Sequence, residues 1–258
     1  MFINGPRFAG QGKVFAASRD ANGNALAHSF AGNISALGIK FNIDVQETHE
    51  STSGGRVQDG RFEKFKKAQL SMTFTDFSKD VLAILYRGNV STVTSGTVTA
   101  ETLPQAAVGN LLALKQANVS SVVITDSTAT PKTLVQDTHY RVNSDKHGSI
   151  EILDLTSSPG PFTQPFKAAY SYGGATVINM LTQPQIERWL RFEGLNTANA
   201  NAPVLIDLYR VVLDPTDNLD LIMDDTGAYT VNGAALYDAS KVSDTVLGQF
   251  GSARLLTA

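Results

Sequence analysis

The sequence predicts a mainly β protein with one short α-helix that covers a sheet and with a small all-β domain in the middle of the chain. Three observations lead to this prediction. Residues 36–46 alternate strictly between apolar and polar side chains, as in a long strand that is buried on one face. Residues 204–213 form a nearly continuous apolar run, which is typical of a strand buried on both faces. Short strand-like runs separated by turn residues fill residues 111–172.

Residues 36–46 and 68–75 are predicted to pair as an antiparallel hairpin. The apolar side of the first strand is expected to face the core and consists of Leu37, Ile39, Phe41, Ile43 and Val45. The opposite side of the two strands is polar and consists of Lys40, Asn42, Asp44, Gln46, Gln69, Ser71 and Thr73.

The connection between these strands, residues 47–67, is far longer than the roughly two to five residues of a usual hairpin loop. It mixes acids and bases with apolar residues that suit a docked segment better than a solvated loop. We therefore expect an arm that reaches a neighbouring subunit. Its contact residues are predicted to be Glu47, Glu50, Arg56, Val57, Asp59, Arg61, Phe62, Glu63, Lys64, Phe65, Lys66 and Lys67.

A short amphipathic helix is predicted over residues 78–88. Ser78 or Thr75 is a suitable N-cap, and Gly88 suits the position that follows a helix. The apolar stripe that would cover the sheet is Phe77, Val81, Ile84 and Leu85. With the hairpin, this helix completes the first half of the main domain, residues 1–92.

The inserted all-β domain is predicted at residues 93–175. It begins in a Thr-, Ser- and Gly-rich stretch, residues 91–109, that resembles a domain junction. Its strand-like runs are residues 111–115, 119–125, 133–135, 139–142, 149–153 and 166–172.

The second half of the main domain, residues 176–258, returns to long strands. Residues 188–196 are read as a strand, although a helix starting at Thr182 is an alternative. A hairpin is predicted at residues 228–238, with Asn232-Gly233 as a type I′ turn. The single tryptophan, Trp189, is expected in the core.

The composition limits the possible functions. Hydrophobic residues make up 42% of the 258 residues and charged residues 17%. The charged fraction is below the usual quarter, which suggests that partners cover part of the surface. The net charge of −3 offers no basic footprint for nucleic acid. Because the chain has no cysteine, disulfides, zinc–thiolate sites and cysteine nucleophiles are excluded.

Catalytic motifs are not found, so the sequence predicts no enzyme activity, no metal and no cofactor. The four histidines are expected to be solvated loop residues and are His28, His49, His139 and His147. The aspartates of one acidic segment could form a weak cation site, but turn and surface positions are favoured for Asp214, Asp217, Asp220, Asp224 and Asp225. No run is long enough for a membrane span, and the first residues lack an export signal.

Charge is distributed unevenly along the chain. Residues 1–92 carry 11 bases and 8 acids, a balance of +3. Residues 93–175 carry 5 and 6, and residues 176–258 carry 5 and 10, balances of −1 and −5. A positive first third and a negative last third favour head-to-tail association of identical subunits.

Several segments together resemble one family. The stretch RFAGQGKVFAASRDANGNALA, the following ETHESTSGGRVQD and FSKDVLAILYRG, and the later RFEGLN, VLIDLYRVVLDP and LDLI resemble bacteriophage tail tube (major tail) proteins of the non-contractile, siphovirus type. The middle stretches VSSVVITDS and TLVQDTHYRVNSDKHGSIEIL resemble a small β domain inserted in some of these proteins.

The resemblance implies a structural virion protein without catalysis or cofactor, whose core is a β-sandwich or barrel flanked by one short α-helix, with the small all-β domain as an insertion. Subunits of this family form hexameric rings that stack into a tube, and viral DNA passes through its lumen during ejection. The implied partners are other copies of the chain, a tape measure protein, and tail terminator and distal tail proteins. The implied location is the virion tail, after assembly in the cytoplasm of the host bacterium. The polar side of the predicted hairpin is our candidate for the lumen face, and an ordinary outer surface is the alternative.

Two other functions remain open from the sequence. A secreted or surface β-sandwich binding module, adhesin-like or pilus-like, would explain the Thr-, Ser- and Gly-rich strands but not the charged arm or the missing export signal. A hydrolase that uses scattered Asp and His residues has no motif to support it.

Overall fold

The computed structural model describes residues 5, 7–241 and 248–256. The prediction that the first residues lack an export signal falls partly on residues outside this described part. The chain forms two compact units, the first made of Met1–Val90 and Ile178–Ala258 and the second of Ser91–Val177. The prediction of a mainly β protein is confirmed. Among the described residues, the helices are α1 (Lys79–Leu85) and the short 3-10 helix η1 (Ala239–Lys241).

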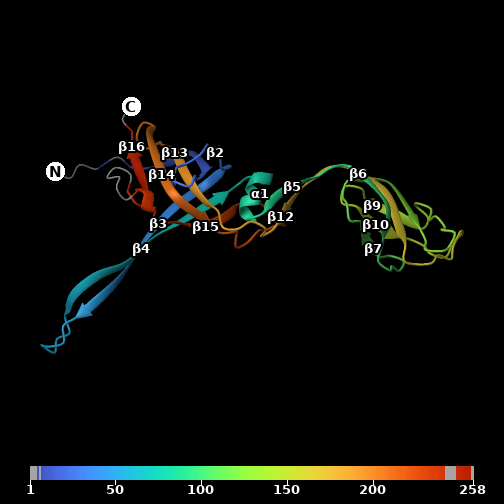
Figure 1. Ribbon diagram of the computed structural model, residues 1–258, viewed down its shortest axis with the longest axis horizontal. Coiled ribbons are helices and arrows are strands. Elements are labelled where there is room, and N and C mark those ends of the chain that lie inside the picture. The colour runs from blue at the N-terminus through green and yellow to red at the C-terminus, as the bar shows by residue number, and fades with distance from the viewer. Residues whose placement is uncertain (1–4, 6, 242–247, 257–258) are drawn as a thin grey trace. The chain divides into compact units, whose positions relative to one another are not determined.

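The first unit is an eight-stranded antiparallel sheet, shown in Figure 1. Its strand order is β2-β1-β13-β14-β15-β4-β3, and β16 also pairs with β14. The strands are β1 (Gly10–Ser18), β2 (Ser29–Phe30), β3 (Ile34–His49), β4 (Gln58–Phe74), β13 (Glu187–Asn196), β14 (Ala202–Leu213), β15 (Tyr229–Ala235) and β16 (Gly251–Leu255).

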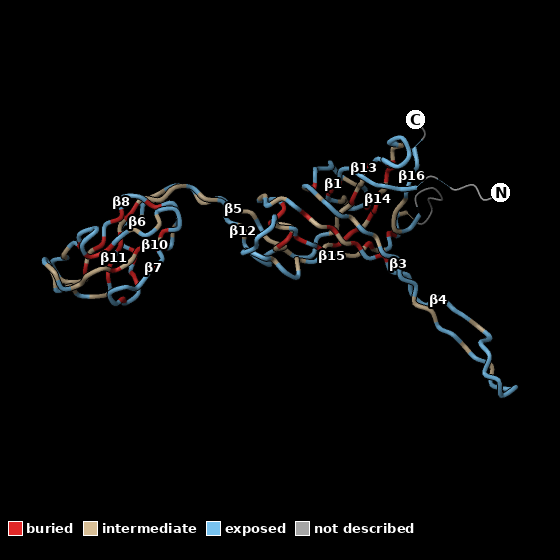
Figure 2. Tube along the Cα trace, turned by 180° about the vertical axis from the view of Figure 1, so that it is seen from behind, coloured by how far each residue is buried: buried red, intermediate tan, exposed pale blue. Residues whose placement is uncertain are grey.

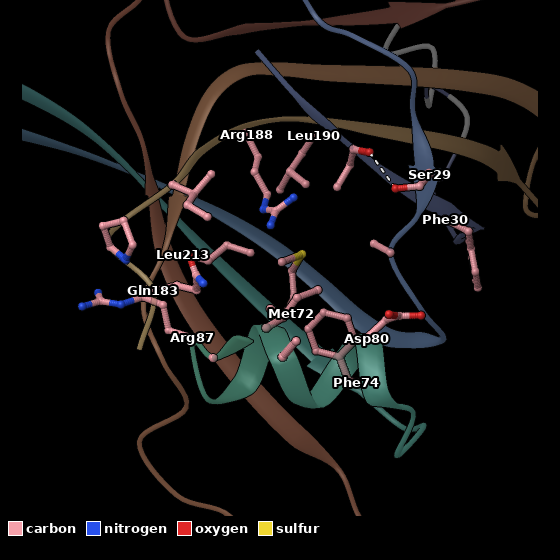
Figure 3. Close-up of a pocket in the computed structure, with 17 residues that line it drawn as sticks. Ser29, Phe30, Met72, Phe74, Asp80, Arg87, Gln183, Arg188, Leu190 and Leu213 are labelled. Carbon is pink, nitrogen blue, oxygen red and sulfur yellow. Dashed lines mark hydrogen bonds between the residues drawn. The ribbon is translucent and has the colours of Figure 1, made fainter. Parts of the chain in front are cut away.

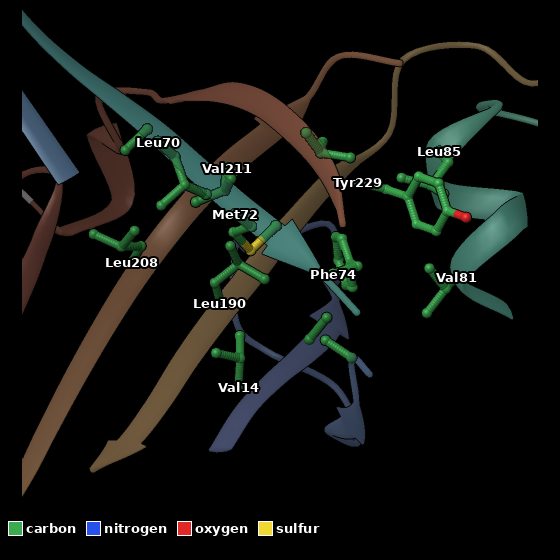
Figure 4. Packing of buried hydrophobic residues seen from close by; sticks show 14 of the residues in the cluster. Val14, Leu70, Met72, Phe74, Val81, Leu85, Leu190, Leu208, Val211 and Tyr229 are labelled. Carbon is green, nitrogen blue, oxygen red and sulfur yellow. The ribbon is translucent and has the colours of Figure 1, made fainter. Parts of the chain in front are cut away.

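One apolar core holds this unit together, and Figure 4 shows part of it. Leu70, Met72 and Phe74 of β4 are almost completely buried in it. Val14 of β1 belongs to the same cluster, and Ile39 of β3 packs against it, although these strands lie near opposite ends of the strand order. The sheet therefore curls around its apolar face into a barrel-like sandwich.

Helix α1 covers this core with Val81, Leu82 and Leu85, while Phe77 stays exposed. Ser78 is the N-cap, and its hydroxyl accepts a hydrogen bond from the Val81 amide. The predicted role of glycine at the helix end was wrong. Arg87 adopts the left-handed conformation with φ of 46°, whereas Gly88 is needed because a Cβ there would lie 2.0 Å from the Asn179 carbonyl oxygen.

The predicted hairpin at residues 228–238 is wrong as well. Asn232 and Gly233 lie inside β15, opposite Ser71 and Leu70 of β4. A Cβ at Gly233 would lie 2.3 Å from the carbonyl oxygen of Val212 in β14. The glycine therefore permits close strand packing instead of a turn.

Trp189 and the segment before it also differ from expectation. Residues 182–186 form no helix, and β13 begins at Glu187. Trp189 is half-buried instead of lying in the core. Its indole N–H donates to Asp207 over 3.1 Å, and its ring packs against Tyr209 with centroids 4.6 Å apart.

The second unit is a small sandwich of two three-stranded sheets, β7-β10-β9 and β6-β11-β8. Its strands are β6 (Gly96–Thr102), β7 (Leu111–Ala113), β8 (Val119–Thr125), β9 (Tyr140–Ser144), β10 (Ser149–Ile152) and β11 (Lys167–Tyr172). A core of its own includes Ile124, Ile150 and Phe166, all fully buried. The insertion predicted at 93–175 corresponds to this unit.

Two details of this region were not predicted. The supposed junction of residues 91–109 contains β6 and most of β5 (Asn89–Val93), which pairs with β12 (Ala175–Asn179) as a separate two-stranded sheet. Residues 133–135 form no strand, and only an isolated bridge joins Thr133 to Thr125.

Candidate self-assembly surface

The arm predicted at residues 47–67 is for the most part a ladder and not a loop. Strands β3 and β4 stay paired out to His49 and Gln58, so the loop is shortened to residues 50–57. Strand β4 pairs with β15 only over residues 68–74, and residues 58–67 pair with β3 alone. The outer part of the hairpin therefore leaves the sheet as a free two-stranded ribbon, as Figures 1 and 2 show.

This ribbon exposes large apolar side chains on both of its faces. Phe41, which lies at the base of the ribbon opposite Ala68, is 70% exposed, and Ile43 is 50% exposed. These values correct their predicted place in the core. Phe62 and Phe65 are 60% and 62% exposed, and they lie opposite Gln46 and Asp44 in the ladder. In a strand, alternate residues point to opposite faces. Phe41 and Ile43 thus share one face of the hairpin. Phe62 and Phe65 both lie on the other face, that of Gln46 and Asp44, because the ladder has an extra residue, Lys64, between them.

Most charged residues of the arm are paired within it. Lys67 Nζ lies 3.1 Å from Asp44, Lys66 Nζ lies 3.1 Å from Glu63, and Arg61 lies 4.0 Å from Glu47. Asp59 accepts a hydrogen bond from the Thr48 hydroxyl over 2.6 Å. The aromatic side chains Phe62 and Phe65, in contrast, are left mostly uncovered by the described part of the chain.

At the tip, the Glu50 carboxylate organises the turn. It accepts hydrogen bonds from the hydroxyl and backbone groups of Ser53 and Thr52. The Ser53 hydroxyl is the main cause that lowers the pKa of Glu50 to about 2. Arg56 and the exposed Val57 lie in the same turn. The tip is therefore locally ordered by side-chain hydrogen bonds.

The candidate lumen face is divided in two by the structure. Lys40 lies opposite Gln69 in the ladder, and Thr73 contacts Thr230 of β15 with hydroxyl oxygens 3.0 Å apart. These residues, with Ser71, form a polar outer face of the sheet that β15 extends through Asn232. Asn42, Asp44 and Gln46 instead lie on the β3 strand of the ribbon, where Phe62 and Phe65 share their face.

A cleft of about 450 Å³ opens in the first unit beside α1. Figure 3 shows Met72, Phe74, Leu190 and Leu213 on its walls and the Arg188 side chain pointing into it. Arg87 and Asp80 also line the cleft. The Nε atom of Arg87 is buried and has no hydrogen-bond partner in the described part of the chain. The residues that line the cleft come from four segments that are far apart in the sequence. No local sequence pattern could therefore have predicted the cleft.

The acidic segment near the cleft is a loop between β14 and β15. The Thr216 amide donates to the Leu85 carbonyl of α1 over 2.9 Å, and Asp217 accepts from Asn232 over 3.2 Å. Beyond this anchor, Leu221 is 74% and Ile222 98% exposed. Asp220, Asp224 and Asp225 flank this apolar tip and are exposed too.

An ion-pair cluster in the first unit was not anticipated from the sequence. Arg19 contacts Glu187 at 2.9 Å and Asp238 at 2.6 Å, and Arg210 contacts Glu187 as well. The hydrogen bond from Arg210 is the largest cause that lowers the pKa of Glu187. Burial alone would raise the pKa of Asp238, but Ser240 and Arg19 lower it overall. The cluster joins Arg19, which follows β1, to Glu187 of β13, Arg210 of β14 and Asp238, which follows β15.

The remaining candidate groups offer little chemistry. His139 is fully buried, contrary to the predicted solvated position. Its Nδ1 accepts from the Val135 amide over 2.8 Å, and its ring packs against Phe162. Within residues 5, 7–241 and 248–256, no three His, Asp or Glu side chains are placed to hold a metal ion. No helix in that part of the chain is long and apolar enough to span a membrane.

Comparison with known proteins supplies a family but no activity. A family model described as "Protein of unknown function UCP028589" matches residues 7–254. No curated protein matches the chain.

Proposed function

The chain belongs to this family of unknown function, and from its structure we propose that it is a self-assembling structural subunit, a tail tube protein of a non-contractile bacteriophage. The observation that carries the proposal is the free ribbon of β3 and β4. Phe41, Phe62 and Phe65 are each at least 60% exposed there. A projecting ribbon with aromatic residues on both faces is a surface that needs a partner.

The energetics favour assembly through this arm. Burying one large apolar side chain stabilises a complex by about 1.5–3 kcal/mol, and the arm offers several. Its ion pairs are exposed and worth little by themselves, so contact is expected to depend mainly on the aromatic residues. An arm on one side of the subunit and its receptor elsewhere form a heterologous interface, which closes into rings or continues into filaments.

In the proposed tube, the polar face of β3, β4 and β15 lines the lumen. Lys40 is the single base among its residues Lys40, Gln69, Ser71, Thr73, Thr230 and Asn232. Few phosphate contacts would form on such a lining, so viral DNA could slide past it. Asn42, Asp44 and Gln46 leave the proposed lining, since they lie on the ribbon.

The second unit, Ser91–Val177, would decorate the outside of this tube. A folded sandwich of its size would block a lumen that must pass duplex DNA and would separate stacked rings. Outer decoration would collide with a contractile sheath, which favours a non-contractile tail. Cryo-electron microscopy of the tube should show a knob on each subunit, and a smooth wall would contradict this placement.

Tube formation is tested by microscopy and sedimentation of the purified protein at increasing concentration. We expect hexameric rings and stacked tubes. A protein that stays monomeric at every concentration and salt level would overturn the proposal and favour the β-sandwich binding module.

Deleting residues 50–62 tests the role of the arm. The deletion leaves residues 46–49 as a turn between the paired Val45 and Glu63, so the subunit is expected to fold but not to assemble. Normal tubes from this variant would contradict the proposed arm contact.

A further inference from the structure

The first unit contains two complementary features that no contact within the described chain brings together. One is the cleft beside α1, which has apolar walls and includes Arg87 and Arg188 among its lining residues. The other is the loop tip Leu221-Ile222-Met223, whose Ile222 is 98% exposed. Resting on the self-assembly proposed above, we propose that this tip of one subunit docks into the cleft of a second copy.

Size and shape support the match. The cleft of about 450 Å³ lies within the range of about 300–1,000 Å³ that is usual for ligand pockets. Its walls include Met72, Phe74, Leu190 and Leu213, which suit aliphatic side chains. Anchor side chains that fill such a pocket dominate the binding energy of an interface.

Charge supports the same occupant. The loop from Asp214 to Asp225 carries five aspartates and no base. The cleft carries two arginines against the single acid Asp80. Figure 3 shows the Arg188 side chain pointing into the cleft, where an incoming carboxylate would pair with its guanidinium group. When the tip docks, the aspartates on both sides of it would therefore bring carboxylates close to the arginine side chains of the cleft.

The occupant is expected to come from another subunit. Within its own chain the loop is held at both ends, by the Thr216–Leu85 hydrogen bond and by the pairing of Tyr229 with Phe74. Between these anchors the tip is exposed and leaves its own cleft open. Donor tip and acceptor cleft are different surfaces, so each subunit can give one and receive one, as a closed ring requires.

Because the chain has no cysteine, site-directed disulfides test this contact cleanly. Ile222→Cys places a thiol on the tip, and Gln183→Cys places one on the cleft wall. Mixed and oxidised, the two single variants are expected to form a linked dimer that neither forms alone. Asn22→Cys, in an exposed turn, replaces Gln183→Cys as the control and should give no link.

A double variant that carries Ile222→Cys and Gln183→Cys in one chain shows whether the cleft binds the tip of another copy or the tip of its own chain. A ladder of linked oligomers supports docking between copies, whereas a link inside a diluted monomer would show that the loop fills its own cleft and overturn the inference. If tubes form but no link appears in any mixture, the inference fails and the proposed function stands. If wild-type protein never assembles, the proposed function itself fails.

An assembly measurement without cysteines provides a second test. Ile222→Ser should raise the concentration needed for assembly by about tenfold or more, with an unchanged melting temperature because Ile222 contacts little in its own chain. Val108→Ser, at a 57% exposed position of the second unit, is the matched control and should assemble normally. Equal assembly of both variants would overturn the docking proposal.

Discussion

At the residue scale, buried charges and close backbone contacts determine which substitutions the first unit tolerates. The Arg19 side chain is only 10% exposed and bridges Glu187 and Asp238. A buried charge that loses its partner is strongly destabilising, because the remaining ion stays desolvated. The cluster also attaches the segment that leads to β16, so its loss is expected to loosen the C-terminal part of the sheet.

Arg19→Ala should therefore lower the free energy of unfolding of the first unit by about 3 kcal/mol. Chemical denaturation measures this change, and Lys13→Ala, at an exposed position of β1, is the control. Equal stability of the two variants would mean that the cluster contributes little.

The same cluster makes stability depend on pH. The pKa values of Glu187 and Asp238 are lowered in the folded state. Their stabilising contribution is therefore complete above the unfolded values near about 4 and is lost as pH falls through the folded values. The melting temperature of the first unit should fall below about pH 4, and it should fall less in Arg19→Ala. An identical pH dependence in both proteins would contradict this assignment.

Gly233 illustrates a limit set by backbone contact. A Cβ at this position would meet the Val212 carbonyl oxygen at 2.3 Å, whereas a Cβ at Gly38 of β3 meets nothing within 4 Å. Gly233→Ala should destabilise the first unit by about 1–3 kcal/mol, and Gly38→Ala should be close to neutral. Thermal unfolding compares them, and a neutral Gly233→Ala would show that β14 and β15 can separate without cost.

At the element scale, the arm has two different faces that can be tested separately. Phe62 and Phe65 point to one side, and Phe41 and Ile43 point to the other. All four are at least 50% exposed, so serine substitutions should leave the fold intact.

We expect Phe62→Ser with Phe65→Ser, and separately Phe41→Ser with Ile43→Ser, to weaken assembly by more than tenfold each if the arm is enclosed by a neighbour. Sedimentation measures the effect. Gln58→Ser, at an exposed position of the same ribbon, should change assembly little. If only one of the two double variants weakens assembly, only one face of the arm contacts the neighbouring subunit.

At the scale of the whole molecule, the proposed lumen face can be mapped by labelling. The chain has no cysteine, so Gln69→Cys and Val57→Cys each introduce one reactive thiol. A bulky thiol reagent should label Gln69→Cys readily in the free subunit and slowly in assembled tubes. Equal reaction in both states would place this face on the outer surface.

The uneven charge of the chain bears on assembly at the same scale. The first 92 residues carry +3 and the last 83 carry −5. The acidic loop from Asp214 to Asp225 carries −5, whereas the arm, residues 47–67, carries only +1. Pairing between exposed charges of different subunits weakens as salt shortens the Debye length. Apolar anchors such as Phe62 and Ile222 are much less sensitive to salt, so the two contributions can be separated.

By itself the sequence determined the mainly β class and the helix at Val81, because alternation and capping are local patterns. The sequence also indicated the arm, because the connection of residues 47–67 is unusually long and contains aromatic side chains. The tertiary structure decided what those patterns could not. Asn232-Gly233 is a strong turn signal, yet it lies in a strand because β4 and β14 pair on both sides of it.

Phe41 and Ile43 continue the core-facing alternation of Leu37 and Ile39, yet they are exposed. Alternation reports which face a side chain takes, but burial depends on whether another element covers that face. The sheet ends at Ala68 of β4, where β15 stops, and only the assembled fold contains that information. The cleft around Arg188 has the same origin, since residues from β1, β4, α1 and β13 meet there only after the sheet has curled.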